Sequence, residues 1–229
     1  MASTRTLEQL LNLDDPGITL VRAWISATGN SVEELPVERA SGERALVALQ
    51  VTSRSPMGAV ALETGGLLID HGWIRVLGGG HARLPRSIHE WNGINVDRPS
   101  PRLRGAVLVA DDAIGGFFAV NGGAFPGPPG HVFYYSPGTL RWDDIASSYS
   151  EWLAGMISGD MKKFYAGERW PGWEKDVAAL PGDRAFSVYP FLFTEGPQMA
   201  KRSRSAVPVE ELWRLYIDDL PKQLTRRLD

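Results

Sequence analysis

Two adjacent carboxylates, Asp111 and Asp112, lie in the segment VLVADDAIGGFFAVNGG (residues 107–123). Such a pair could bind a metal ion or act in acid–base catalysis, because close like charges raise the pKa of one member. The same residue types also form β-turns, since an Asp side chain accepts local backbone N–H groups and Gly lets the chain reverse. Neighbouring residues of a strand point to opposite faces, so the two carboxylates need not converge on one ligand. We interpret the segment as a hairpin.

The remaining polar residues form no recognised catalytic pattern. The chain has four histidines and no cysteine, and it contains neither HExxH nor a close His-x-His pair of the kind that binds zinc. It has no Gly-x-Ser-x-Gly elbow. The Gly-rich stretches LGGGHARLP and NGGAFPGPPG lack the following helix or the lysine that a phosphate-binding loop needs. We expect no metal and no cofactor, and we favour a protein that is not an enzyme.

Aromatic clusters indicate surfaces that must be covered. The FF pair at 117–118 and the FYY run at 133–135 lie in expected strands, so some of their rings face each side of the sheet. Either helices of the chain or a partner protein covers the second side, and we favour the helices. The basic cluster of Lys201, Arg202 and Arg204 has no aromatic interleaving, and we interpret it as a solvated loop.

Composition describes a chain that can bury a large core and that has no strong charge field. It has 229 residues, 43% of them hydrophobic and eight of them Trp, which suffices for a well-buried core. Its 24 basic and 27 acidic residues give a net charge of -3, which disfavours nucleic acid as a partner. The N-terminus lacks a signal-peptide apolar region, and no apolar run is long enough to span a bilayer. We expect a cytoplasmic protein without membrane insertion.

The N-terminal part is expected to be helical. Thr6 and Gln9 have the spacing of a capping box. Asp15 and Pro16 begin a second helix, with apolar residues on one face, that ends at Gly29. The stretch VEELPVERASGE after it is interpreted as a surface connection. RALVALQV (44–51) is too short for periodicity to separate helix from strand, and we assign it to helix.

The middle of the chain has a β pattern. Residues 58–80 contain three short β-like runs separated by Gly-containing turns, and residues 104–137 contain three more. The segment between them, 83–105, is rich in Pro, Arg and Asn and is interpreted as an excursion over the surface.

The C-terminal part returns to helix. Trp152 and Met156 share one face of a helix that begins near Ser148 or Ser150. AFSVYPFLF is expected to be a late edge strand interrupted by Pro190, the polar stretch 194–208 to be mobile, and Pro208 to begin the last helix. The sequence predicts one α+β domain over 1–229, with an antiparallel sheet centred on 58–136, helices at both ends and a helical extension over 148–229.

The order of RTLEQLLNLDDPG, the 58–80 block, VLVADDAIGGFFAVNGG, GHVFYYSPGTLRWDD and RWPGW resembles a bacterial family, domain of unknown function 2625, over nearly the whole chain. More distantly, GG.L.DHGW.R..G, VLVADDAIGGFFAV, VFYYS and SYSEWL resemble the SUKH superfamily, which includes a yeast cell-wall regulator and bacterial toxin-immunity proteins. That resemblance implies an antiparallel sheet in which the Asp-Gly segment is a hairpin, and binding to other proteins. The part beyond about Gly159 exceeds a minimal SUKH domain.

Two hypotheses of different classes follow. The first is a cytoplasmic protein-binding module of immunity or regulatory type, whose partner is engaged near Asp111, Asp112, Asn121 and Tyr134. The second is an enzyme or small-ligand binder with a pocket at Asp111, Asp112 and Asn121, which requires another segment to fold over the hairpin. Homo-oligomerisation through an edge strand remains open.

Overall fold

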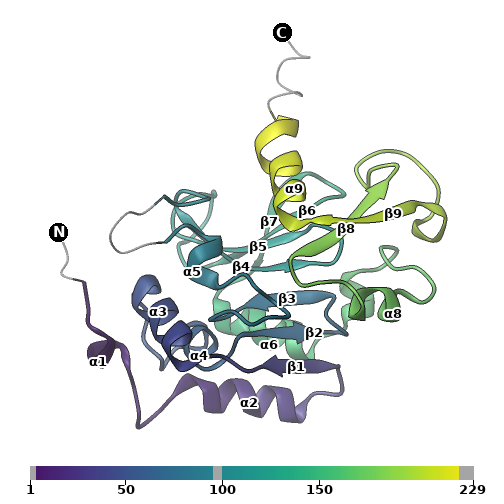
Figure 1. The fold of residues 1–229 in the computed structure, drawn as a ribbon. Coiled ribbons are helices and arrows are strands. Elements are labelled where there is room, and N and C mark those ends of the chain that lie inside the picture. Colours follow the sequence, from purple (N-terminus) through teal and green to yellow (C-terminus); the bar gives the residue numbers. More distant parts are fainter. Residues whose placement is uncertain (1–3, 95–99, 222–229) are drawn as a thin grey trace.

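The computed structural model describes residues 4–94 and 100–221. Its centre is an antiparallel sheet of seven strands that are neighbours in the order of the chain, which confirms an α+β fold (Figure 1). The strands are β1 (Val32–Leu35), β2 (Gly66–Ile69), β3 (Ile74–Leu77), β4 (Ala106–Asp112), β5 (Phe117–Asn121), β6 (Val132–Ser136) and β7 (Arg141–Ala146). A separate two-stranded hairpin consists of β8 (Arg184–Tyr189) and β9 (Ser203–Pro208).

Short helices surround the sheet. They are α1 (Leu7–Leu10), α2 (Gly17–Ala27), α3 (Arg39–Leu49), α4 (Pro56–Glu63), α5 (Ile88–Trp91), α6 (Tyr149–Ser158), α7 (Met161–Phe164), α8 (Trp173–Ala178) and α9 (Val209–Trp213). After α9 the chain continues as a π-helix over Arg214–Asp219, and a 3₁₀ turn lies at Met199–Lys201. Within the described residues, no helix is long and apolar enough to cross a membrane.

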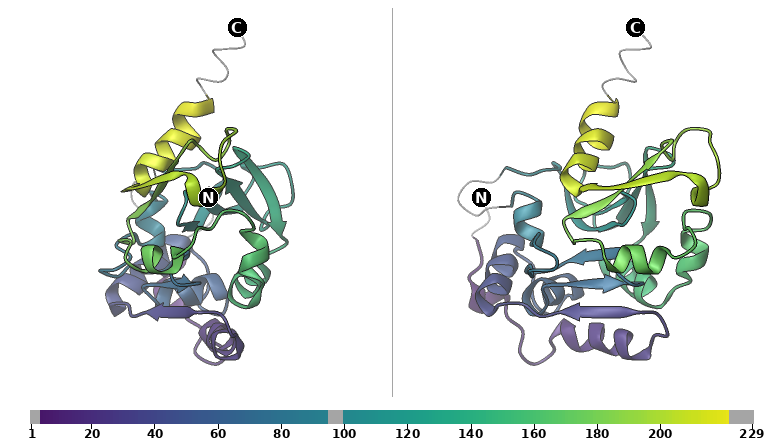
Figure 2. Two further views of the ribbon diagram at one scale, coloured as in Figure 1. Left: turned by 90° about the vertical axis from the view of Figure 1, so that its right-hand side faces the viewer. Right: turned by 45° about the vertical axis from the view of Figure 1, so that its right-hand side comes forward.

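The aromatic residues of the sheet are covered by the chain itself on both faces. Phe117 contacts Trp213 of α9, with ring centroids 5.1 Å apart, whereas Phe118 contacts Trp152 of α6 at 5.4 Å. The two neighbours thus point to opposite sides, as strand geometry requires. Helices α2, α4 and α6 pack together on the side of Phe118, while α9 packs against β8 and β9 on the other, and Figure 2 shows the two layers. Internal covering of the aromatic clusters, favoured from the sequence, is confirmed.

The capping signal of the first helix is confirmed, and that of the second helix is wrong in part. The Thr6 hydroxyl accepts the Gln9 backbone N–H and the Gln9 side chain accepts the Thr6 N–H, so the expected capping box is present. The second helix begins at Gly17 after Pro16, without a side-chain cap from Asp15. The ambiguous apolar stretch at 44–51 belongs to α3 over most of its length, which confirms the helix assignment.

The first expected strand is wrong, because residues Pro56–Glu63 form helix α4. Ser55 caps this helix by accepting the N–H of Gly58, and Pro56 occupies the first turn, where its missing N–H costs nothing. Most of the helix is buried, so its apolar residues show no periodicity that separates a helix from a strand. The main sheet also extends beyond 58–136, since β1 and β7 add strands at its two edges.

Two segments expected on the surface are more ordered than their composition indicated. Within 83–105, Trp91 and Asn92 are buried, and the Asn92 side chain bonds the backbone of β4 at Leu108. Residues 95–99 of that stretch lie outside the described part. Within 194–208, residues 203–208 form β9 in register with β8.

Candidate functional site

The segment that raised the question of chemistry is a β-hairpin joining β4 to β5. Asp112 Oδ1 accepts the backbone N–H of Ile114 at 3.0 Å and of Gly116 at 2.7 Å, and Gly115 has a φ of 88°. A Cβ on Gly116 would lie 2.2 Å from Asp112 Oδ2, so only glycine leaves room for the carboxylate. The turn interpretation is confirmed, because the Asp112 side chain accepts backbone N–H groups within the turn.

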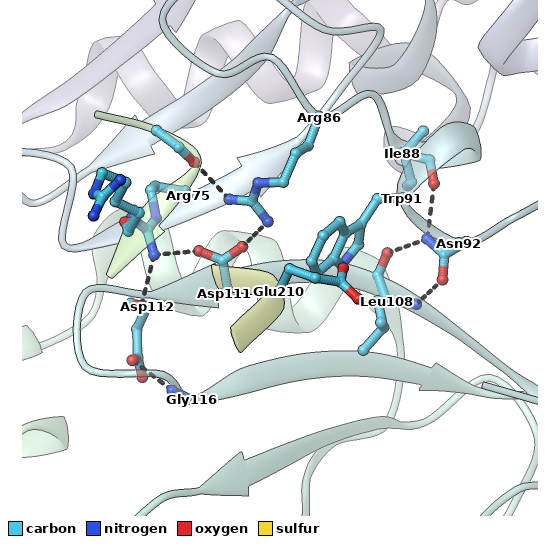
Figure 3. Close-up of polar contacts among 12 residues, drawn as sticks. Arg75, Arg86, Ile88, Trp91, Asn92, Leu108, Asp111, Asp112, Gly116 and Glu210 are labelled. Atoms are coloured by element: carbon cyan, nitrogen blue, oxygen red, sulfur yellow. Dashed lines mark hydrogen bonds and ion pairs between the residues drawn. The ribbon is translucent and has the colours of Figure 1, made fainter. Parts of the chain in front are cut away.

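Asp111 points to the face of the sheet that carries β8 and α9, and it is the centre of a buried ion-pair cluster (Figure 3). Its Oδ1 lies 2.5 Å from Arg75 Nη2, and its Oδ2 contacts Arg86 Nη1. Asp111 and Arg75 are 1% and 2% exposed. The two guanidiniums also donate to backbone carbonyls, Arg75 to Arg184 and Arg86 to Gly182. Asp111 on β4 binds Arg75 and Arg86, and these two guanidiniums bind the backbone at the start of the β8–β9 hairpin. The cluster therefore connects β3 and β4 with that hairpin.

Asp112 points to the opposite face and lies among tyrosines. Its Oδ2 accepts the hydroxyl of Tyr134 at 2.7 Å and that of Tyr165 at 3.3 Å. Burial raises the pKa of Asp112, against the opposing effect of these hydrogen bonds. Burial, together with the adjacent carboxylate, also raises the pKa of both tyrosines well above its usual value. The hydroxyls are thus donors to Asp112 and remain protonated at neutral pH.

Asn121, at the end of β5, organises the loop that follows. Its side-chain oxygen accepts the N–H groups of Gly123 and Phe125, at 2.9 and 3.1 Å, and its amide nitrogen lies within 3.3 Å of the carbonyls of Phe125, Gly127 and Pro128. It is 2% exposed, so its amide is buried within the loop that it organises.

The four predicted site residues are not brought together in one cleft. Asp112 and Tyr134 contact each other, Asp111 lies on the other face, and Asn121 serves a loop at the far end of β5. All four are buried. Partner binding near them stays a prediction, and their burial means that they would act by shaping the surface above them. In the part of the chain that the structure describes, no three His, Asp or Glu side chains are grouped to hold a metal ion.

A cavity of about 590 Å³ lies beside this cluster, between strands β1 to β3 and residues 177–183. Its lining includes His71, Arg75 and Arg83 but neither Asp111 nor Asp112. The hypothesis of an enzyme or small-ligand binder therefore has a cavity near the carboxylates. Arg75 lines this cavity, whereas Asp111 and Asp112 do not.

Sequence reasoning missed the partners of the carboxylates. Arg75 interrupts the apolar run WIRVL, and a charge inside an otherwise apolar strand signals a buried ion pair. Arg202 was interpreted as part of a solvated loop, but its guanidinium donates to the carbonyls of Pro190, Phe191, Thr194 and Pro197. The sequence can thus indicate that Arg75 has a buried partner, but it does not identify which residue that partner is.

Glu168 makes the free energy of unfolding depend on pH. Burial, with Asp112 nearby, raises the pKa of Glu168 from 4.5 to about 7. The folded protein then binds this proton more tightly than the unfolded chain, so the contribution is stabilising below about pH 4.5 and is lost as the pH rises to about 7. We expect the unfolding free energy to fall by up to about 3 kcal/mol across this interval, and Glu168→Gln to remove most of the fall.

Urea unfolding at several pH values between about 4.5 and 7.5 measures this slope. The exposed Glu174→Gln is the matched control and should retain the slope of the original protein. An unchanged slope in Glu168→Gln would contradict the assignment.

Comparison with known proteins relates the chain to proteins without an assigned activity. Residues 7–212 match the family described as "Protein of unknown function DUF2625". The chain is 40% identical over 211 residues to the uncharacterised protein YbfG of Escherichia coli (strain K12), covering 92% of this chain and 95% of that protein. It is 40% identical over 188 residues to an uncharacterised protein of Haemophilus influenzae (strain ATCC 51907 / DSM 11121 / KW20 / Rd), covering 82% of each. The relationship to SUKH proteins stays a prediction.

Proposed function

We propose that this chain, which belongs to the DUF2625 family, is a cytoplasmic protein-binding module, with an immunity or regulatory role as the SUKH resemblance implies. The observation that carries the proposal is a partly exposed aromatic segment that begins at the last residue of β8, Tyr189, and leads toward β9. We call residues 189–193 (YPFLF) the aromatic loop. Figure 2 shows the chain between β8 and β9 extending from the body of the molecule.

The aromatic loop presents the Tyr189 ring to solvent, while Phe191 and Phe193 are partly buried. Tyr189 is 67% exposed, whereas most large apolar side chains of the described residues are buried. The rings of Phe191 and Phe193 stack with centroids 5.3 Å apart and planes 9° from parallel, and Tyr189 meets Phe191 edge-on at 6.2 Å. Aromatic side chains are enriched among the residues that dominate protein interfaces, because they bring large contact area with little rotamer freedom to lose.

Arg202 holds the loop in a defined shape. Its Nη1 donates to the carbonyls of Pro190 and Phe191, each at 2.6 Å, and its other nitrogens donate to those of Thr194 and Pro197 at 3.1 and 3.0 Å. A loop fixed before binding loses less conformational entropy when it meets a partner. Four carbonyls bound by one side chain support a preorganised contact surface.

The test is capture of a partner from the organism's own lysate, followed by measurement of its affinity with purified proteins. We expect Tyr189→Ala combined with Phe191→Ala to weaken binding by at least about tenfold, because truncated interface aromatics typically cost about 2 kcal/mol or more. Leu13→Ala, which changes another exposed apolar side chain at 84% exposure, is the matched control and should bind normally.

Circular dichroism and thermal unfolding must show that the double variant is folded. Arg202→Lys tests preorganisation separately, since an ammonium cannot reach four carbonyls in the geometry of a guanidinium. Equal affinity of the original protein and the Tyr189→Ala, Phe191→Ala variant for a stoichiometric partner would refute the role of the aromatic loop.

The cavity over Arg75 favours a second candidate, a small-ligand binder or enzyme. Its volume of about 590 Å³ falls within the common range of ligand sites, and its lining carries both charges: His71, Arg75 and Arg83 with Glu33 and Asp183. Arg83 is paired with Glu33 and Arg75 with Asp111, so the lining does not select the sign of a ligand's charge. A thermal-shift screen of polar metabolites of either charge tests this candidate, because a ligand that binds only the folded state raises the melting temperature.

A further inference from the structure

The outer edge of β7 (Arg141–Ala146) is a free sheet edge. On its inner side the strand pairs with β6, from Arg141 opposite Ser136 to Ala146 opposite Val132. No other segment within the described ranges hydrogen-bonds to its backbone. The opposite edge is different, because β1 has only four residues and α2 lies beside it through the ion pair of Arg22 with Glu34. A six-residue edge with unpaired N–H and C=O groups is a template for a further strand.

Apolar pockets flank this edge on both faces of the sheet. On the face of α9, a cavity of about 240 Å³ is lined by Tyr135, Leu140, Trp142, Tyr216 and Ile217. On the face of α6, a cavity of about 490 Å³ is lined by Ile145, Trp152, Met156, Met161 and the partly exposed Phe164. Side chains of an added strand alternate between the two faces, so neighbouring residues of one peptide are directed toward different pockets.

The middle of the edge is acidic. Asp143 and Asp144 are exposed and lie opposite Tyr134 and Phe133 of β6, so their carboxylates are on opposite faces. Asp144 has His131 Nδ1 at 2.8 Å, whereas Asp143 has no ion-pair partner among the residues described. An incoming strand therefore meets negative charge on either face at its centre.

We propose that the free edge of β7 binds an extended segment of a different protein by strand addition, and that this segment carries Lys or Arg near its centre and apolar residues on both sides of it. A second copy of this chain fits less well. Antiparallel pairing of two copies about a two-fold axis keeps each face of the sheet on the same side, so the central registers set Asp143 against Asp143 or Asp144 against Asp144. Like charges opposite each other destabilise a strand pair. The inference does not rest on the aromatic loop.

Labelled peptides test the proposal by fluorescence anisotropy. The probe is the heptapeptide Thr-Leu-Val-Lys-Ile-Leu-Thr, and the matched control has Glu in place of Lys. We expect the Lys peptide to bind at least about tenfold more tightly than the Glu peptide. Only alternate backbone amides of an added strand face β7. We therefore compare two N-methylated forms of the Lys peptide, one methylated at residues 3 and 5 and one at residues 2, 4 and 6. One form should lose binding and the other should keep it.

Protein variants assign the binding to this edge. Asp143→Asn with Asp144→Asn should remove most of the preference for Lys over Glu, whereas Asp14→Asn with Asp15→Asn, an exposed acidic pair elsewhere, should leave it unchanged. Any of three results would overturn the proposal: no binding of the Lys peptide, equal effects of the two methylation patterns, or equal affinity for the Lys and Glu peptides. Sedimentation showing a dimer that excludes the Lys peptide, and that Asp143→Asn with Asp144→Asn strengthens, would give the edge to a second copy and also overturn it.

Discussion

Asp111→Asn is expected to lower the free energy of unfolding by about 3–5 kcal/mol, because it leaves two buried guanidiniums without their counter-charge. Asp111 is the only carboxylate that the described residues place within ion-pair distance of Arg75 and Arg86, and all three are at most 9% exposed. Removing one member of a buried cluster costs more than the cluster contributes as a whole, since the remaining charges cannot regain water. Urea unfolding at neutral pH measures the loss.

The adjacent carboxylate provides the matched control. Asp112→Asn retains an oxygen for the N–H groups of Ile114 and Gly116 and removes a charge whose burial already raises the pKa of Asp112. Its amide nitrogen cannot accept the hydroxyls of Tyr134 and Tyr165, which donate to Asp112 Oδ2. We expect it to lower the unfolding free energy by about 1–3 kcal/mol, the cost of leaving buried hydroxyls without an acceptor, which is less than the loss in Asp111→Asn. Equal losses in the two variants would show that hydrogen-bond geometry, and not charge, dominates both sites. A loss below about 1 kcal/mol in Asp111→Asn would contradict the buried-pair account.

Trp73→Ala is expected to cost about 3–5 kcal/mol, the usual range for emptying a large aromatic site in a core. Trp73 is fully buried in the turn between β2 and β3, and its ring lies 5.1 to 5.7 Å from the rings of Tyr165, Trp170 and Trp173. The guanidinium of Arg169 stacks over the same ring at 5.0 Å. The Trp73 side chain therefore packs the segment around α7 and α8 against the sheet.

Two comparisons make the Trp73 test specific. Trp73→Phe keeps an aromatic ring and should lose only about 1–2 kcal/mol, because the cavity left behind is smaller. Leu20→Ala removes a side chain that is 47% exposed and should lose less than either. Equal unfolding free energies of Trp73→Ala and Leu20→Ala in urea would contradict the conclusion that the aromatic contacts of Trp73 stabilise the fold.

The hairpin could be predicted from sequence because all of its determinants are local. An Asp that accepts the N–H groups two and four residues ahead, followed by two glycines, specifies a reversal without reference to the rest of the chain. The alternation of side chains along β4 likewise separates Asp111 from Asp112 in any fold that makes this segment a strand. The same reasoning succeeded for the capping box at Thr6.

Features that depend on distant partners could not be predicted. Arg86 lies in a stretch rich in Pro and Arg, and only the folded chain places it against Asp111. Strand β7 has the sequence RWDDIA, which lacks the alternation of a half-buried strand because the edge of the sheet leaves both of its faces partly in water. Helix α4 was assigned to a strand because a buried apolar run has the same composition in either form.

The position of the Arg75 and Arg86 hydrogen-bond acceptors has a consequence for how the protein is made. The last strand of the main sheet is synthesised by residue 146, but the carbonyls that receive these two guanidiniums belong to Gly182 and Arg184. A nascent chain emerging from the ribosome can therefore form its seven strands, with Asp111 beside both guanidiniums, before the carbonyls that accept their remaining N–H groups are made. Completion of the core must wait for the C-terminal hairpin, and we expect chains truncated before residue 182 to be less stable and more readily cleaved by proteases.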